Sequence, residues 1–189
     1  MTEPGQGLVV LVNGLPGAGK SALAEPLAAA LGLPLFGKDL IKETIADVLG
    51  SDSADGRPQR AWNAALGASS SETIWMLLRF AYSGAVLESN FSGAADLAAA
   101  GLRRAGVDRP LEIWCDVPVE LATKRYRQRA SARHPIHRNG PGDPEEDTGW
   151  WRAQDRPLGL GPVLRVDTSR VVSVADVATW CRDQAAAPA

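Results

Sequence analysis

The sequence has few cysteines, few histidines and no long apolar run, and each shortage excludes a class of protein. Only two cysteines, Cys115 and Cys181, occur in 189 residues. They are too few for a disulfide framework, so we expect a cytoplasmic protein. No apolar stretch approaches the roughly 18 residues of a membrane-spanning helix, and the first residues lack the features of a signal peptide. The only histidines, His134 and His137, have no cysteine at ligand spacing, so a zinc site is not expected.

An excess of charge of one sign is also missing. The formal net charge is −2 and the pI is near 5.7, which gives no overall attraction to nucleic acid or anionic lipid. Hydrophobic residues make up 45% and charged residues 22% of the chain, as is usual for one globular domain of this length. We therefore expect a single domain over residues 1–189, with anionic ligands held by local basic groups. The oligomeric state stays open.

The most informative stretch is LVNGLPGAGKSALAEPL, residues 11–27, which contains the spacing GxxxxGKS. A buried strand is predicted before it at 8–12 and a helix after it at 21–31, which is the context that a phosphate-binding loop needs. Backbone N–H groups of such a loop surround phosphate oxygens, Lys20 reaches the β- and γ-phosphates, and the Ser21 hydroxyl ligates Mg²⁺. The predicted cofactors are ATP and Mg²⁺. The predicted loop contacts are Gly14, Leu15, Pro16, Gly17, Ala18, Gly19, Lys20, Ser21 and Ala22.

Strand and helix patterns alternate along the rest of the chain, which is typical of a parallel sheet covered on both faces. Further strands are predicted at 33–36, 85–88, 111–115 and 163–166. Further helices are predicted at 38–49, 60–83 with a break near Gly67, 93–105, 118–132 and 173–185. The expected fold is a three-layer α/β P-loop NTPase fold with five parallel strands in the nucleoside-kinase-like order 2-3-1-4-5. A helical insert at about 51–83 is expected to build the acceptor site.

Two carboxylates follow neighbouring strands of this sheet. In LFGKDLIKE, Asp39 comes just after the second strand, where it can accept a proton from a substrate hydroxyl or cap the next helix. Lys38 beside it either holds substrate or is solvated. In VLESNF, Glu88 ends the third strand and either holds Mg²⁺ or contacts substrate, with Asn90 and Phe91 as further candidate contacts.

A basic segment follows the fourth strand. Arg125, Arg129 and Arg133 are spaced i, i+4 and i+8, so one continuous helix would place them on one face. They either stabilise the charge of a transferring phosphoryl group or form a solvated basic face. An acidic block at 143–147 follows and could pair with them when nucleotide is absent. We predict a lid over residues 124–150, including the RHPIH segment at 133–137.

Aromatic side chains in the predicted insert allow two interpretations. Trp62 and Trp75 lie at helical spacings that favour the core. An apolar acceptor pocket would nevertheless have to come from this region, because the other side of the phosphate loop belongs to the nucleotide. Both tryptophans are therefore kept as candidate substrate contacts.

The segments GLPGAGKS, FGKDLIKE, the arginine helix and VDTS together resemble the small P-loop kinases grouped around chloramphenicol phosphotransferase and the zeta-toxin kinases. The resemblance covers most of the chain. It implies that Asp39 is the catalytic base, that Arg125 and Arg129 begin the lid, and that Asp167 and Thr168 lie near the adenine. Glu88 departs from the family pattern, which often has Asp at this point.

Three functions follow as hypotheses. The first is an ATP-dependent kinase that phosphorylates a hydroxyl of a small, partly apolar metabolite or antibiotic, with Asp39 as base. The second is a polynucleotide or nucleotide-sugar kinase, against which the absence of long basic tracks argues. The third is a nucleotide-dependent switch or binding module without phosphotransfer, which needs no base. No membrane partner is expected.

Overall fold

The computed structural model describes residues 7–53, 56–137 and 148–187. The acidic block at 143–147 and the middle of the predicted lid lie outside these residues. No helix in the described ranges combines the length and apolar character that crossing a bilayer demands.

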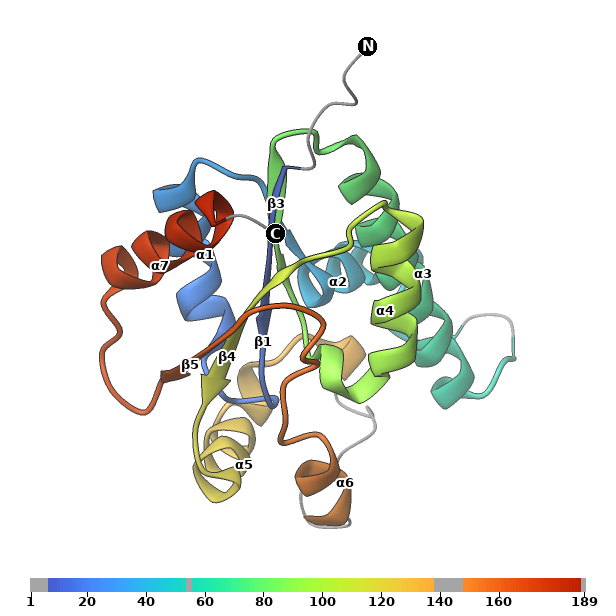
Figure 1. The fold of residues 1–189 in the computed structure, drawn as a ribbon. Helices are drawn as coiled ribbons and strands as arrows, with labels where there is room; N and C mark the ends of the chain where they lie inside the picture. Colours follow the sequence, from blue (N-terminus) through green and yellow to red (C-terminus); the bar gives the residue numbers. More distant parts are fainter. Residues whose placement is uncertain (1–6, 54–55, 138–147, 188–189) are drawn as a thin grey trace.

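One parallel sheet of five strands lies at the centre of the molecule, in the order β2-β3-β1-β4-β5 (Figure 1). This confirms the predicted order, with the strand before the phosphate loop in the middle. The strands are β1 Leu8–Asn13, β2 Leu35–Gly37, β3 Gly84–Glu88, β4 Leu111–Asp116 and β5 Val163–Asp167. The inner strands are rich in aliphatic residues and buried on both faces, as parallel strands between helical layers must be.

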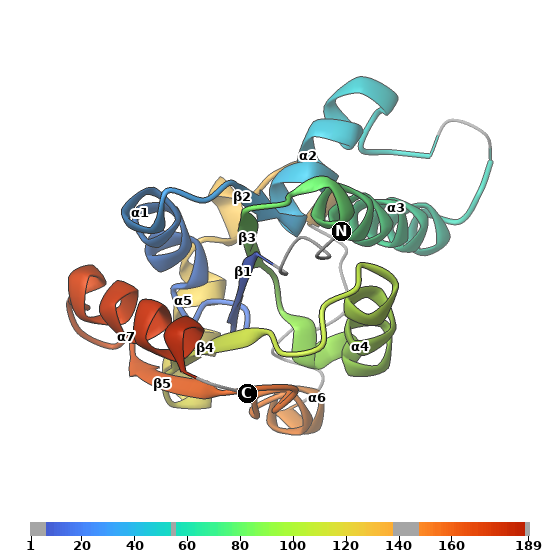
Figure 2. The ribbon, with the colours of Figure 1, turned by 45° about the horizontal axis from the view of Figure 1, so that its top comes forward.

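Helices cover both faces of the sheet (Figures 1 and 2). Helices α1 (Lys20–Leu31) and α7 (Val174–Ala186) pack on one face, where Val10 and Val12 of β1 point. On the other face α3 (Gln59–Phe80) and α4 (Ala95–Arg104) cover Val9 and Leu11. The alternation of β1 side chains between two cores follows from the period of two in a strand.

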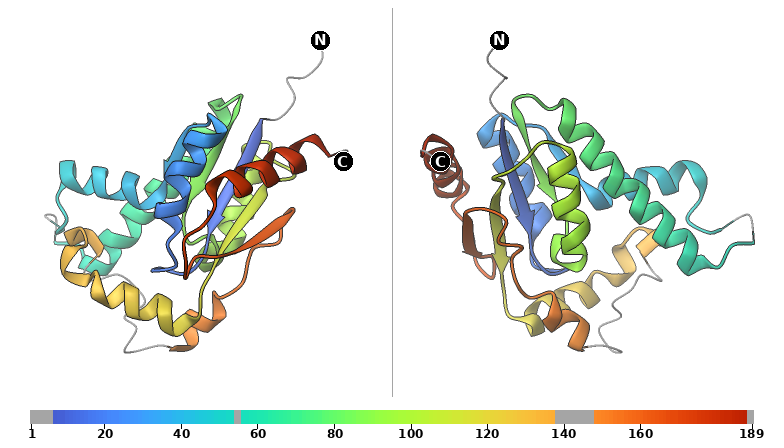
Figure 3. Two further views of the ribbon diagram at one scale, coloured as in Figure 1. Left: turned by 90° about the vertical axis from the view of Figure 1, so that its left-hand side faces the viewer. Right: turned by 45° about the vertical axis from the view of Figure 1, so that its right-hand side comes forward.

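The remaining helices gather at the carboxyl edge of the sheet or beside it (Figure 3). They are α2 Lys38–Leu49, η1 Phe91–Ala94, α5 Val119–Gln128, η2 Ala130–Ala132, η3 Pro135–His137 and α6 Thr148–Ala153. Because all five strands run in parallel, their carboxyl ends share this edge with the phosphate loop. Ligands of open α/β sheets bind at this edge.

Two helix predictions were wrong. Helix α3 runs unbroken through Gly67, whose carbonyl accepts a hydrogen bond from the Ser71 hydroxyl at 3.0 Å. A glycine costs an exposed helix only about 1 kcal/mol, which the packing of α3 on the sheet offsets. Helix α5 ends at Gln128 instead of 132, because Arg129 leaves helical geometry and the chain continues as the 3₁₀ turn η2.

Candidate functional site

The phosphate-binding loop between β1 and α1 has the geometry that its glycines require. Gly17 and Gly19 have φ of 85° and 92°, which L side chains rarely adopt. A Cβ at Gly17 would also collide with the Ala122 carbonyl oxygen of α5. The Lys20 Nζ donates to the Leu15 carbonyl oxygen at 3.0 Å, so the lysine side chain reaches across the phosphate-binding loop.

A buried side-chain network holds the start of this loop, and the sequence analysis missed it. The Asn13 Oδ1 accepts hydrogen bonds from the amides of Gly14 at 2.8 Å and Phe91 at 3.0 Å. Its Nδ2 donates to Glu112 Oε1 at 2.8 Å. Glu112 is 1% exposed, and its two carboxylate oxygens also accept from the amides of residues 158 and 159. The signal in the sequence was a single glutamate in an otherwise apolar strand, LEIWC.

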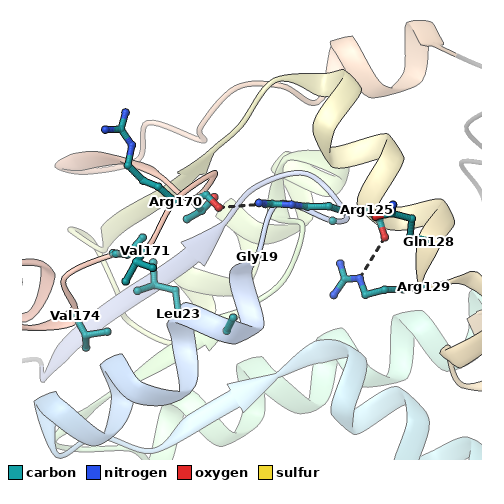
Figure 4. A pocket seen from close by; sticks show the side chains of 12 residues that line it. Gly19, Leu23, Arg125, Gln128, Arg129, Arg170, Val171 and Val174 are labelled. Atoms are coloured by element: carbon teal, nitrogen blue, oxygen red, sulfur yellow. Dashed lines mark hydrogen bonds between the residues drawn. The ribbon is translucent and has the colours of Figure 1, made fainter.

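A cavity of about 540 Å³ opens beside the loop on the side of α5 and α7 (Figure 4). Gly17, Gly19 and Ala22 line it together with Arg125 and Arg129. Segment 170–174 forms its other wall, with the apolar side chains of Val171, Val172 and Val174 next to Arg170. The cavity therefore joins a phosphate cradle to a partly apolar wall, which suits a nucleotide whose base lies against 170–174.

The end of β5 forms part of this wall. The Thr168 hydroxyl donates to the Ala18 carbonyl at 2.6 Å and so ties β5 to the loop. The Thr168 carbonyl accepts from Arg125 at 3.1 Å. Asp167 is exposed and accepts from Ser169 and Arg170. These hydrogen bonds lower its pKa to about 2, and its carboxylate therefore acts as a turn cap.

The three candidate arginines are not on one helical face. Arg125 and Arg129 both line the cavity, and the Arg129 Nε donates to the Arg125 carbonyl at 3.4 Å. Arg133 lies beyond the end of α5 with its guanidinium 4.1 Å from the centre of the Tyr126 ring. The early end of α5 separates Arg133 from the nucleotide cavity and brings it toward α2.

Asp39 and Glu88 meet on the opposite side of the loop. In the sheet register Glu88 is level with both Val12 and Gly37, so Asp39 begins α2 just beyond it. The N-cap position of α2 is occupied by Gly37, with no side-chain cap. Asp39 is therefore not the N-cap residue. Its side chain is open to water on one side.

Neighbouring charges favour the ionised form of Asp39. Desolvation by the surrounding protein raises the pKa of this carboxyl, but nearby cations lower it by more, and the net pKa is below its usual value. The side chains that contribute are His137 in its protonated form, Lys38, Lys20 and Lys42. Burial lowers the pKa of His137 itself. For Glu88, which is 8% exposed, desolvation outweighs the attraction of Lys20 and raises the pKa. The two carboxyls thus differ: the pKa of Asp39 lies below its ordinary value and that of Glu88 above its own, so Asp39 is the stronger acid of the two.

The RHPIH segment docks onto α2 through its two histidines and Ile136. The His137 Nε2 lies 2.9 Å from Glu43 and the His134 Nε2 lies 3.0 Å from Asp47. Between them Ile136 is buried against Ala46 and other side chains of α2 and α3. No cluster of three metal-ligating side chains occurs within residues 7–53, 56–137 and 148–187. This part of the predicted lid, residues 133–137, is therefore a strap anchored on α2, on the same side of the loop as Asp39.

The remaining candidates divide between core and surface of the site. Trp75 is 5% exposed and packs near Phe91, with 6.0 Å between ring centroids, so both belong to the core. Trp62 is partly buried, and its indole donates to the Gly50 carbonyl. The Asn90 amide donates to Gln154 at 2.6 Å. The Ser21 hydroxyl is exposed at the start of α1, in reach of a cation on the phosphates.

A protein-family model described as AAA domain matches residues 9–140 of the chain. The matched segment begins in β1, includes the phosphate loop, Asp39 and Glu88, and extends beyond the strap. The chain belongs to this family. A search of the curated proteins finds no significant match.

Solved structures carry the same fold over nearly the whole chain. A candidate kinase from Chloroflexus aurantiacus J-10-fl is 28% identical, with a TM-score of 0.73, and the match covers 95% of this chain and 98% of that one. Shikimate kinase from Aquifex aeolicus is 11% identical, with a TM-score of 0.57 and coverage of 94% and 96%. The tunicamycin resistance protein of Deinococcus radiodurans is 16% identical, with a TM-score of 0.54 and coverage of 96% for both chains. This AAA-domain protein therefore has the fold of small P-loop kinases.

Proposed function

We propose that the protein is an ATP-dependent phosphotransferase that moves the γ-phosphoryl group to a hydroxyl of a small molecule, a metabolite or an antibiotic. We also propose that the protein is related to the chloramphenicol phosphotransferase group of small P-loop kinases, which its sequence motifs resemble. The observation that carries it is the position of Asp39. An ionised, water-accessible carboxylate lies at the carboxyl edge of the sheet, within electrostatic reach of Lys20 of the phosphate loop.

The two sides of the loop support separate roles. The cavity on one side is lined by Arg125, Arg129 and segment 170–174, which brings three valines and Arg170, and this combination suits a nucleotide. Asp39 and Glu88 follow β2 and β3 on the other side, where an acceptor would meet the γ-phosphate. A transferring phosphoryl group between them would lie in line between its donor and its acceptor, as phosphoryl transfer requires.

Each residue then has a chemical role. Asp39 accepts the proton of the attacking hydroxyl, for which a lowered pKa keeps it ionised. Lys20 and the two cavity arginines, Arg125 and Arg129, offset the charge that spreads over the phosphoryl oxygens. ATP would supply the phosphoryl group, and bound Mg²⁺ would neutralise its oxygens. Ser21 would hold the ion, and Glu88 would orient the ion or the acceptor.

The test has two steps on the full chain. First, a panel of hydroxylated metabolites and antibiotics is screened for phosphoryl transfer from ATP. Second, Asp39→Asn is compared with wild type on the best acceptor, with ATP affinity titrated in the same preparation. We expect kcat to fall by roughly 10²–10⁴-fold, the usual contribution of a general base, with ATP affinity retained.

Asp96→Asn is the matched control, because Asp96 is also an exposed acid in the first turn of a helix, α4. Both substitutions remove a favourable interaction with a helix N-terminus, worth about 0.3–1 kcal/mol. Only Asp39→Asn should lose transfer. Retained transfer in Asp39→Asn would contradict the proposed base. ATP binding without transfer to any acceptor would favour a nucleotide-dependent switch.

A further inference from the structure

A buried polar pair joins α2 to α3, and its member on α2 lies three residues after Asp39. Lys42 is 8% exposed and Asn63 is 4% exposed. The Lys42 Nζ donates a hydrogen bond to the Asn63 Oδ1. Because an ammonium can only donate, this contact fixes which end of the Asn63 amide faces the lysine.

The other end of that amide is left without a partner. The Asn63 Nδ2 is buried and has no hydrogen-bond acceptor among the described residues. An unsatisfied buried donor costs about 1–3 kcal/mol, so such a group calls for an acceptor atom. Lys42 can donate three hydrogen bonds, and the Asn63 carbonyl takes one of them. Two kinds of spare donor therefore lie side by side.

The charges around this pair are predominantly positive. Burial lowers the pKa of Lys42 to about 8, and the charges of Lys38 and Arg133 lower it as well. The nearby carboxylates, Asp39 and Glu43, oppose this effect. Glu43 already accepts from His137. Within the described residues Lys42 has no ion pair, so this cation lacks the carboxylate partner that buried charges normally have.

We propose that Lys42 and Asn63 form a subsite for a carboxylate group of the acceptor, so that the substrate is a small hydroxy acid. This inference rests on the proposed function, because it places the acceptor hydroxyl at Asp39. Residues three apart on a helix lie about 5–6 Å from each other on one face, so Asp39 and Lys42 would contact the two ends of one small acceptor.

Carboxylate fits the donors better than the alternatives. Its two oxygens match one ammonium and one amide donor, and its single negative charge balances the excess of Lys38, Lys42 and Arg133 over Asp39 and Glu43. A phosphate dianion would bring twice the repulsion to Asp39. A buried water would satisfy the Asn63 donor but would leave the lysine without a counter-charge.

The test follows binding without nucleotide, so it does not depend on phosphotransfer. The full-length protein is titrated with glycolate, the smallest hydroxy acid, and separately with neutral glycolamide. The Asn63 side-chain amide resonance, identified by its loss in Asn63→Leu, is followed by NMR. We expect a saturable shift with glycolate in the millimolar range and none with glycolamide. Lys42→Met should abolish the response.

Lys124→Met is the matched control, because Lys124 is an exposed lysine on α5 away from this pair, and it should keep the response. The comparison of the two ligands in wild type needs no variant, so an unstable Lys42→Met protein leaves the test intact. Equal responses to glycolate and glycolamide, or no saturable response, would overturn the subsite. If glycolate binds but no compound of the whole acceptor panel is phosphorylated, the proposed function fails and the carboxylate site stands. If other acceptors are phosphorylated but no hydroxy acid is, the assignment of the acceptor as a hydroxy acid is overturned.

Discussion

The nucleotide side and the acceptor side of the phosphate loop are built in different ways. Backbone geometry dominates the nucleotide side, where glycines at 17 and 19 and carbonyl contacts of Thr168 shape the cavity. Side-chain pairs between distant segments dominate the acceptor side, where His137 meets Glu43 and Lys42 meets Asn63. Under the proposed function, the first side would bind phosphates mainly through the backbone, whereas the second would distinguish acceptors through its side chains.

Under the proposed function, this difference predicts that substrate specificity resides on the side of Asp39 and Lys42. A backbone cradle reads phosphate geometry and tolerates most side-chain changes outside the glycines. A buried charged pair is costly unless a ligand or a partner compensates it. Substitutions on the two sides should therefore affect different measured quantities.

The largest effect should come from Lys20→Ala. The lysine is 9% exposed and bonded to the Leu15 carbonyl, so it lies where the β- and γ-phosphates are expected. We expect transfer to fall by roughly 10³-fold or more, as for other charged groups that act on the transferring phosphoryl. Steady-state kinetics measure it, with Lys124→Ala as control. Near-normal turnover in folded Lys20→Ala protein would contradict the role of the phosphate loop in transfer.

Arg125→Ala and Arg129→Ala test the charged side chains of the proposed nucleotide side. If these side chains stabilise charge in the transition state, kcat should fall on the order of 10²-fold and nucleotide affinity should fall less. Arg133, which stacks on Tyr126 away from the cavity, should affect the acceptor KM more than ATP binding. Kinetics at varied ATP and acceptor concentrations separate these effects. If the variants keep kcat and change only its salt dependence, the arginines form a solvated basic face.

Glu112→Gln tests the network behind the loop. Its carboxylate accepts from Asn13 and from two backbone amides, so an amide nitrogen in its place must face a donor. The loss should be about 1–3 kcal/mol of stability, and roughly tenfold in ATP affinity, with acceptor binding unchanged. Glu120→Gln, an exposed glutamate of α5, is the control. Denaturant unfolding and nucleotide titration measure both effects.

The smallest effect concerns the pH dependence of stability. The pKa of Lys42 is about 8 in the folded chain against an ordinary 10.5. Between these values the unfolded chain binds more protons, so stability should rise with pH. We expect wild type to gain on the order of 1 kcal/mol relative to Lys42→Met from pH 8 to 10.5. A constant difference across this range would place Lys42 in water.

Much of the fold could be predicted from local sequence pattern. The strands, their order and the position of the phosphate loop follow from aliphatic runs that alternate with helical periods. The end of α5 could not be predicted, because the spacing of Arg125, Arg129 and Arg133 fits a longer helix equally well. The chain leaves helical geometry at Arg129, and Ile136 further on packs between α2 and α3. Such a contact between distant segments is not encoded in a local pattern.

The residues of the candidate site likewise fall into those that local motifs predict and those that they do not. Lys20, Ser21 and Asp39 were predicted because short motifs place them on a strand end or loop. Asn63 and Glu112 were missed, since a single amide in a helix and a single glutamate in a strand have no distinctive spacing. Their partners lie 21 residues away for Asn63 and 99 residues away for the bond to Asn13.

The Asn13 side chain links the loop to folding order. Through it, the Gly14 amide depends on Phe91, Glu112 and, beyond them, the backbone at 158–159. These segments span most of the sequence, so the hydrogen bonds around the loop are complete only once all of them are in place. The Gly14 amide should therefore exchange with deuterium only when the whole domain opens, and a truncated or newly emerging chain would have no phosphate site to offer.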